Sequence, residues 1–398
     1  MNRQPVTKLE QLVECEISCE GMYLKDIDIT FKFDLRDLTS GKPGNTHKID
    51  IDNISCHRME FTDLHVSEDV RIVGSVIRCI TFTDCEFGES KDGLSSVFVE
   101  TDVMEQLTFV DCTFKGTVDL LIKNVKNRIE FEDCVFEKDL IVSNLCLDKS
   151  AEISLNGEKA RVKGDCTFRF CTIGGKLDIR CDIDKTLRMS EVNAGVGDKS
   201  MVQNSRLSLE GCTIQNIRFF KCNYGLVDII NAEIYNIHEQ MSFFAMLQND
   251  APLIFRDAAI RNNDDLNVQK YSAFLYDQIL TGKAEIQDKI LLWLNKYSNA
   301  YGMSWLRGVV FTLVVTLILY LLLNCFGCDN PFFVFDLKFR GFWEVCLGFF
   351  SLLDIFDLAD NGVKLDLTPA GRCMLFVGRI FIAYGIWQTI YAFYKFRK

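Results

Sequence analysis

The sequence predicts a mixed fold, in which an N-terminal β-solenoid is followed by a helical linker and a C-terminal α-helical transmembrane domain. Three observations predict it. One short phrase recurs along the first half of the 398-residue chain, apolar residues then switch to helical spacing, and two long apolar runs lie near the C-terminal end. These changes divide the chain into residues 1–50, 51–262, 263–303 and 304–398.

Residues 1–50 contain looser strand-like material and a polar turn. We expect them to form an end cap or the first coils, because a solenoid needs a covered end to avoid open strand edges.

Residues 51–262 are predicted to form the solenoid because the phrase Phe-x-Asp-Cys-x-Phe recurs there. It occurs at residues 82–87, 109–114 and 131–136, with looser copies at 165–168 and 209–214. Apolar and polar residues alternate within each copy, as in a half-buried strand, and free cysteine packs as a small apolar residue. Repeats roughly 20 to 30 residues apart indicate stacked coils. A β-sandwich with irregular loops is the alternative, but it does not explain a repeated phrase.

Residues 263–303 are predicted to form two amphipathic helices joined at Gly282. They would link the solenoid to the membrane as a rigid coupler and carry motion into the first span. The apolar face of the first helix consists of Tyr271, Phe274, Leu275 and Ile279, and that of the second consists of Ile286, Ile290, Leu291, Trp293, Leu294 and Tyr297.

Two apolar runs in residues 304–398 predict membrane spans. Residues 308–326 carry no charge and residues 373–394 carry one, Arg379. Each run is long enough to cross a hydrocarbon core of about 30 Å. A shorter apolar segment, residues 341–357, could be re-entrant, interfacial or spanning. This layout is typical of a small ion-channel pore, and because two spans cannot enclose water, a pore would require an oligomer.

Charged residues in this region are the pore or gating candidates, because a charge in a membrane is costly unless it pairs, snorkels or faces water. A ring of Asp354 or Asp357 would favour cations, and a ring of Arg379 would favour anions. Arg379 could instead pair with Glu344, Asp354 or Asp357 in the middle segment. The potassium-filter phrase Thr-Val-Gly-Tyr-Gly is absent.

Three glycines, Gly371, Gly378 and Gly385, recur at intervals of seven residues in the second run. This spacing places them on one helix face, where another helix can approach closely. The neighbouring helix could belong to the same subunit or to another subunit around a symmetry axis.

Composition limits the other function classes. The net charge of −11 and the pI of about 5.0 argue against general attraction to nucleic acid. The chain has four histidines and no Cys-x-x-Cys pairs with histidine partners, which argues against a zinc site, and no metal or cofactor is expected. The phosphate-cradling glycine loop and the Gly-x-Ser-x-Gly elbow are both absent, so we do not expect an enzyme.

The charges also predict an orientation. Met1–Glu10 lacks the apolar core of a signal peptide, so we expect the 17 cysteines to stay reduced in a cytoplasm. Lysines and arginines before the first run and after the second place the N-terminal domain and the C-terminus inside. In a bacterium this would be a multi-pass protein of the inner membrane.

Two segments carry a resemblance to a known group. Leu291–Leu306 and Gly378–Phe393 resemble bacterial membrane proteins that have an N-terminal pentapeptide-like β-helix. Within that group, the layout is similar to the membrane effectors of Hailong anti-phage defence systems. This resemblance implies a tetrameric ion channel that single-stranded DNA oligomers, made by a partner nucleotidyltransferase, hold closed until infection. No residue-level DNA motif is carried over.

A site for a DNA oligomer or another nucleotide needs basic groups for phosphates and aromatic faces for bases. Ordinary outward-facing residues of a solenoid are the alternative interpretation of every candidate. The candidates are Arg169, Phe170, Arg218, Phe219, Phe220 and Lys221, with a purely basic patch at Lys123, Lys126 and Arg128.

The sequence as a whole therefore favours an inner-membrane channel gated by a cytoplasmic solenoid sensor. A non-conducting, membrane-anchored scaffold for a protein partner and a tension-gated channel are the alternatives.

Overall fold

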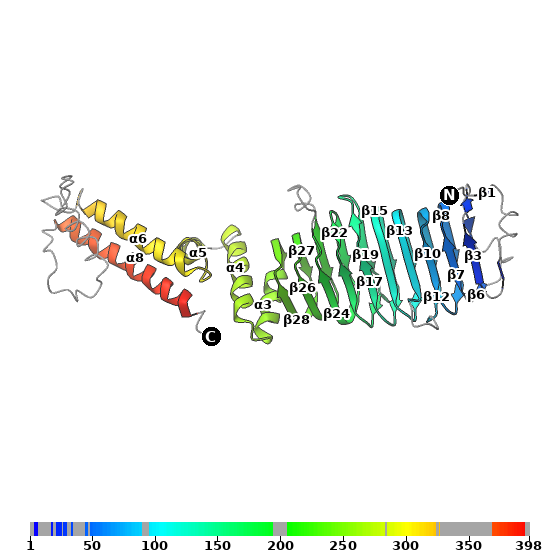
Figure 1. Cartoon of the computed structure of the whole chain (residues 1–398). Helices are drawn as coiled ribbons and strands as arrows, with labels where there is room; N and C mark the ends of the chain where they lie inside the picture. The colour runs from blue at the N-terminus through cyan, green and yellow to red at the C-terminus, as the bar shows by residue number, and fades with distance from the viewer. Residues whose placement is uncertain are drawn as a thin grey trace. The chain divides into compact units, whose positions relative to one another are not determined.

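The computed structural model describes residues 48–89, 95–193, 205–282, 285–323 and 368–394, Phe326, and the backbone of six short strands before residue 48. The chain forms two compact units, Met1–Asn263 and Asp264–Lys398. The first is a long ladder of strands and the second is helical (Figure 1).

The first unit begins with β1 (Gln4–Val6), β2 (Ile17–Ser18), β3 (Gly21–Lys25), β4 (Ile27–Ile29), β5 (Phe33–Asp34), β6 (Gly44–Thr46), β7 (Ile49–Asp52), β8 (Ser55–Thr62), β9 (Leu64–Val66) and β10 (Val70–Val73). It continues with β11 (Val76–Thr83), β12 (Glu86–Phe87), β13 (Val97–Val110), β14 (Thr113–Phe114), β15 (Val118–Glu132), β16 (Val135–Phe136), β17 (Leu140–Ser143), β18 (Cys146–Leu147), β19 (Glu152–Asn156) and β20 (Arg161–Val162). The last strands are β21 (Cys166–Arg169), β22 (Thr172–Ile173), β23 (Lys176–Ile179), β24 (Asp182–Ser190), β25 (Arg206–Glu210), β26 (Thr213–Phe220), β27 (Asn223–Ile230), β28 (Glu233–Gln240) and β29 (Phe243–Asn249).

These strands build a parallel β-solenoid of about eight turns, which confirms the predicted fold. Among the described strands, every pairing except β2 with β3 is parallel, and strands inside the ladder pair with strands one coil before and one coil after them. A β-sandwich would require antiparallel neighbours, so that alternative is wrong. The described strands before residue 48 pair in the same ladder, as β3 does with β7, and therefore extend the coils.

The repeated phrase forms the aromatic core of the solenoid. Its first phenylalanines, Phe82, Phe109 and Phe131, lie opposite one another in β11, β13 and β15. Their rings stack with centroid separations of 4.9 and 5.1 Å, close to the spacing of neighbouring strands. The second phenylalanines make a parallel column, in which Phe87–Phe114 and Phe114–Phe136 are 5.0 and 4.8 Å apart. Each copy thus contributes one ring to each of two buried columns.

The Asp-Cys pair of the phrase forms a corner of each coil. Asp84, Asp111 and Asp133 adopt positive φ values of 53°, 51° and 51°, a conformation that aspartate tolerates better than most residues. The cysteine that follows is buried, and its thiol donates to a backbone carbonyl, as Cys85 does to Thr83 at 3.2 Å. The cysteine therefore provides a weak hydrogen bond in addition to apolar packing.

One of the looser copies was wrongly assigned. The register of β21 places Cys166 opposite Leu140 and Leu187, on a different side of the coil from the phenylalanine columns. The copy at 209–214 is in register, because Leu209 lies opposite Ile179. Irregular coil lengths explain the error, since sequence spacing alone does not fix the side of the coil.

A helix that the sequence analysis missed, α3 (Ala251–Arg261), follows the last strand. Its Phe255 is fully buried and packs against Phe219 and Phe244 of the last coils. Such a helix covers the end of the solenoid core, which would otherwise expose apolar rings.

The second unit contains α4 (Asp265–Thr281), α5 (Ile286–Asn299), α6 (Trp305–Leu322) and α8 (Pro369–Tyr394). Helices α4 and α5 confirm the predicted linker pair, with Gly282 directly after α4. The predicted runs 308–326 and 373–394 correspond to α6 and α8, which both begin a few residues earlier. The middle segment 341–357 lies outside the described residues.

Candidate functional site

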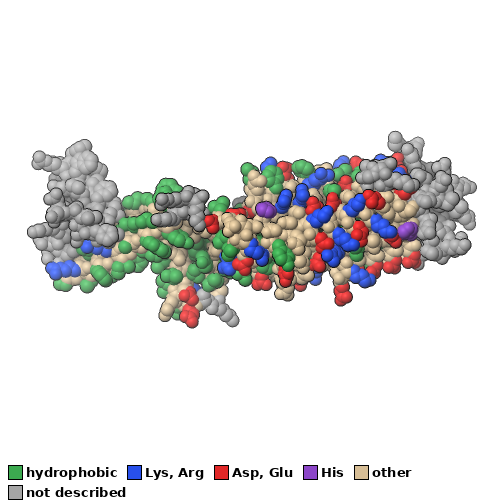
Figure 2. All heavy atoms as spheres, turned by 90° about the horizontal axis from the view of Figure 1, so that it is seen from below, with side chains coloured by type: hydrophobic (Ala, Val, Ile, Leu, Met, Phe, Trp, Pro, Cys, Tyr) green, Lys and Arg blue, Asp and Glu red, His purple; other side chains and the backbone are tan. Residues whose placement is uncertain are grey.

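Helices α6 and α8 pack side by side as a hairpin with an apolar exterior (Figures 1 and 2). Both are long and apolar enough to cross a membrane. Their exposed side chains include Val310, Ile318, Phe376 and Ile380, whereas the solenoid surface in Figure 2 is a mixture of acidic and basic groups. The hairpin can therefore anchor the solenoid in a bilayer.

Small residues hold the two helices close together. A Cβ on Gly378 would collide with Leu319, and one on Gly385 would collide with Thr312. From the other side, a Cβ on Gly308 would lie 3.1 Å from Thr389 Cα. Gly378 and Gly385 therefore face a helix of the same subunit, not a helix of another subunit.

The remaining membrane candidates are placed only in part. Gly371 lies in the first turn of α8, where its N–H donates to the Thr368 hydroxyl at 3.0 Å. Arg379 follows Gly378 on α8 and is half-buried. Glu344, Asp354 and Asp357 lie outside the described residues, so a pairing with Arg379 stays a prediction.

A buried polar network connects the end of α5 to α8. Gln388 Nε2 donates to Asn295 Oδ1 at 2.9 Å, and the Tyr384 hydroxyl donates to the same oxygen at 2.6 Å. Asn299 donates to the side chain and the backbone carbonyl of Gln388, and its own oxygen accepts from the Gly302 N–H at 2.8 Å. Asn299 and Gln388 are almost fully buried. Sequence analysis did not single out this network, although its members lie in the two segments that carry the resemblance.

A second set of polar contacts connects α4 to the same region. Asp277 of α4 accepts a hydrogen bond from the Tyr301 hydroxyl at 2.8 Å and forms an ion pair with Lys296 of α5 at 3.0 Å. Burial and the hydrogen bond to the Asp277 carboxylate raise the pKa of Tyr301, which keeps the phenol protonated. Helices α4, α5 and α8 are therefore joined by hydrogen bonds as well as by packing.

Most of the nucleotide-binding candidates gather along one side of the late solenoid. Arg188 and Arg218 lie opposite each other in β24 and β26, and His238 follows Arg218 in β28. In the next column, Arg169 and Phe220 lie on either side of Ser190. The sequence analysis missed Arg188. It lies on β24, between β21 with Arg169 and β26 with Arg218.

The corner next to these columns carries Phe170 and Lys221. Phe170 is 57% exposed, and Lys221 lies 5.1 Å from the Phe220 ring centroid. Both adopt positive φ, 54° for Phe170 and 50° for Lys221, which is unusual for such side chains. Lys221 also forms an ion pair with Glu191 at 3.3 Å.

Phe219 requires a correction. Its side chain is buried in the solenoid core beside Phe244, because alternation along β26 turns it inward while Arg218 and Phe220 face out. It therefore cannot stack on a base.

The predicted basic patch on β15 is largely neutralised. Lys123 pairs with Asp102 at 2.6 Å and Arg128 with Glu130 at 3.3 Å. Lys126 is exposed and has no ion-pair partner in the described part of the chain. Within the described residues this patch therefore retains one unpaired cation, Lys126.

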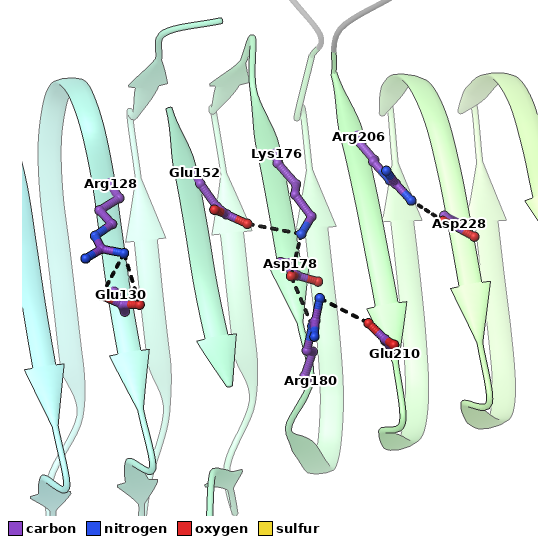
Figure 3. Close-up of polar contacts among 9 residues, drawn as sticks. All are labelled: Arg128, Glu130, Glu152, Lys176, Asp178, Arg180, Arg206, Glu210 and Asp228. Carbon is purple, nitrogen blue, oxygen red and sulfur yellow. Dashed lines mark hydrogen bonds and ion pairs between the residues drawn. The ribbon is translucent and has the colours of Figure 1, made fainter. Parts of the chain in front are cut away.

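Ion pairs between neighbouring coils lie on the outer surface of the solenoid (Figure 3). Asp178 is nearly buried between Lys176 at 2.5 Å and Arg180 at 3.1 Å, and these two also reach Glu152 and Glu210, both at 3.1 Å. Because each cation of this network contacts two carboxylates, the network cross-links neighbouring coils.

Most of the described cysteines of the solenoid are buried. Burial raises the pKa of Cys171 to about 11 and that of Cys212 to about 12, so both remain thiols at neutral pH. In the described residues no cluster of cysteine, histidine and carboxylate side chains has the geometry to hold a metal ion.

Comparisons with protein-family models, with curated proteins and with solved structures find no match to this chain. The fold and the hairpin thus define its class: a β-solenoid that two apolar helices can anchor in a membrane.

Proposed function

We propose that this chain is the subunit of an ion channel in a bacterial inner membrane, gated by its cytoplasmic solenoid. The observation that carries the proposal is the buried network of Asn295, Asn299, Tyr384 and Gln388, which ties the linker helix α5 to the membrane helix α8. An inert anchor has no need of such a connection. A gate needs one, because a sensor can act on a pore only through elements that both contact.

The hairpin supports an oligomeric pore. Its two helices are in close contact through Gly308, Gly378 and Gly385, and the pocket between them, lined by Leu319, Leu322 and Met374 among others, is almost wholly apolar. Water would then pass between subunits, and several hairpins arranged around an axis would be required. We propose a homotetramer, which is the assembly that the resemblance to Hailong effectors implies.

The late solenoid supports an anionic ligand. Arg188, Arg218 and His238 follow one another at the coil spacing of about 4.8 Å. Asp165 pairs with Arg188 at 3.0 Å, but Arg218 has no ion-pair partner among the described residues. Neighbouring like charges on a sheet are destabilising, and a bound anion would relieve that repulsion.

Exposed Phe170 and half-buried Phe220 beside these cations fit a single-stranded nucleic acid, in which phosphates and bases need both kinds of partner. We therefore propose that a DNA oligomer, or another nucleotide product of a partner nucleotidyltransferase, binds there and sets the state of the channel in anti-phage defence.

Current recordings from the purified chain in planar bilayers test the channel. We expect discrete conductance steps, and we expect Arg379→Gln to change their size or ion selectivity if Arg379 faces the pore. A well-folded oligomer that conducts no current would refute the channel and favour the membrane-anchored scaffold. Steps that appear only under applied pressure, without any ligand, would favour tension gating.

Binding of fluorescent single-stranded DNA oligomers tests the ligand. We expect Arg218→Ala to weaken binding and Lys185→Ala to leave it unchanged, since Lys185 is also an exposed cation but lies at another position of the coil. Equal affinities for the two variants would remove this site from the proposal, while the channel proposal would stand on its recordings.

A further inference from the structure

Helix α5 has its polarity reversed relative to a helix in a water-soluble protein. Its polar residues Asn295, Ser298 and Asn299 are half-buried or buried and turned toward the rest of the helical unit, where the two asparagines bond to α8. Its outward face carries an apolar stripe at intervals typical of one helix face. The stripe consists of Ile286, Ile290, Trp293 and Tyr297, which are 78%, 57%, 52% and 58% exposed.

In water such a helix would expose a continuous apolar stripe while burying amides, and both arrangements are unfavourable. The same arrangement is favourable where the surroundings are apolar. The lipid bilayer and a second copy of the chain are the two apolar surroundings that we compare.

The aromatic residues of the hairpin decide between them. At the end of the hairpin next to α5, Trp305 stacks on Phe393 at 5.0 Å and Trp387 stacks on Tyr391 at 5.6 Å. Tryptophan and tyrosine collect at the boundary between hydrocarbon and headgroups. Gln388, which bonds to α5, is the neighbour of Trp387 in this belt.

Helix α5 itself has the composition of a helix that lies in this boundary. Trp293 and Tyr297 pack together at 4.7 Å in its apolar stripe, and Lys289 lies along the side of the stripe. Lys296 lies on the same side but is paired with Asp277. Lysine stems can cover apolar surface while their ammonium groups reach the lipid phosphates. A helix with these features lies in the membrane surface rather than across it.

We propose that α5 is an interfacial membrane helix, with Ile286, Ile290, Trp293 and Tyr297 in contact with phospholipid at the level of the aromatic belt. The proposal rests on the membrane anchoring by α6 and α8, and it is independent of channel activity. It gives α5 a second role: this linker helix contacts the spanning helix α8 and also binds the bilayer surface.

Fluorescence quenching by brominated phospholipids tests the proposal in the full-length chain reconstituted into bilayers. The four tryptophans are Trp293, Trp305, Trp343 and Trp387. One variant retains Trp293 alone, with the other three changed to phenylalanine. The matched control retains Trp387 alone, which is exposed on the spanning helix α8. Circular dichroism and gel filtration establish that both variants fold and assemble like the parent protein.

We expect Trp293 to lose as much emission as Trp387 does, and bromine near the top of the acyl chain to quench Trp293 more than bromine near its end. If Trp387 is quenched and Trp293 is not, the proposal is overturned: a blue-shifted emission of Trp293 would then indicate a second copy over the stripe, and a red-shifted emission would indicate water. Stronger quenching by deep bromine would also overturn it, because α5 would then lie within the hydrocarbon. If neither tryptophan is quenched, the membrane anchoring itself is refuted.

Discussion

Gln388 of α8 donates a hydrogen bond from its side-chain nitrogen to the side-chain oxygen of Asn295 in α5, at 2.9 Å. This bond is the centre of the polar network that connects the linker to the membrane hairpin. The predictions below address this network, the packing of the hairpin, the core of the solenoid and its thiols.

Replacing Gln388 with alanine should destabilise the helical unit. The change removes the side-chain hydrogen bonds of Gln388 to Asn295 and Asn299 from a largely buried network, which costs about 1–3 kcal/mol. Unfolding of the detergent-purified chain, followed by circular dichroism, measures the effect. The control is Gln287→Ala on the exposed part of α5, which should leave the unfolding midpoint unchanged. Equal midpoints for the two variants would contradict the importance of the network.

Replacing Gly378 with leucine should separate α6 from α8, because the new side chain would occupy the space of Leu319. We expect loss of the proposed oligomer on gel filtration and loss of any channel current. Gly378→Ala should have a smaller effect in the same direction. The control is Val377→Leu, which adds bulk at the neighbouring position, where the side chain is exposed. Native assembly of Gly378→Leu would show that the contact is dispensable.

Replacing Phe109 with alanine should strongly destabilise the solenoid. Phe109 is fully buried, stacks on Phe82 and Phe131 of its own column and contacts Phe114 of the other column. Removing a buried phenylalanine from a core costs about 3–5 kcal/mol. Guanidinium unfolding of the full-length chain measures the shift of the midpoint. Val103→Ala, at an exposed position of the same strand, should change it little, and a similar small shift for Phe109→Ala would disprove the stacking argument.

Alkaline pH should weaken the solenoid through its buried thiols. Burial raises the pKa of Cys171 from 9.0 to about 11 in the folded chain. Above pH 9 the unfolded chain loses the thiol proton while the folded chain retains it, so the stabilisation present below pH 9 declines as the pH rises toward 11. Unfolding midpoints between pH 7 and 11 measure the decline, and Cys171→Ala should make it shallower. An identical decline in that variant would show that this thiol does not contribute.

Several features could be predicted from the sequence because they depend on neighbouring residues. The alternation within Phe-x-Asp-Cys-x-Phe indicates strands, and its recurrence indicates coils, which the stacked columns of Phe82, Phe109 and Phe131 confirm. Helical spacing predicted α4 and α5, and long apolar runs predicted α6 and α8. The sequence indicates that the glycines on α8 are packing positions, but it does not indicate that they contact α6.

The binding candidates were predicted less well. The mixture of basic and aromatic residues at 169–170 and 218–221 was found, but the position of Phe219 in the core was missed. Alternation along β26 contained that information, since Ile217 and Phe219 are two residues apart and face the same way. Arg188 was missed because its place between the two clusters depends on coil lengths, which the sequence does not state.

The sequence by itself determined which segments become coils, linker helices and apolar spans, because periodicity and hydrophobicity act over a few residues. Only the tertiary structure decided which coil positions lie side by side, which glycines face α6, and that α5 turns its asparagines inward and its apolar stripe outward. These relationships join residues that are far apart in the chain, such as Asn295 and Gln388, and they depend on register and helix packing. The orientation of α5 has a further physical reason. Beside lipid, amides are most stable where they are hydrogen-bonded inside the protein, and apolar side chains are most stable where they face the lipid.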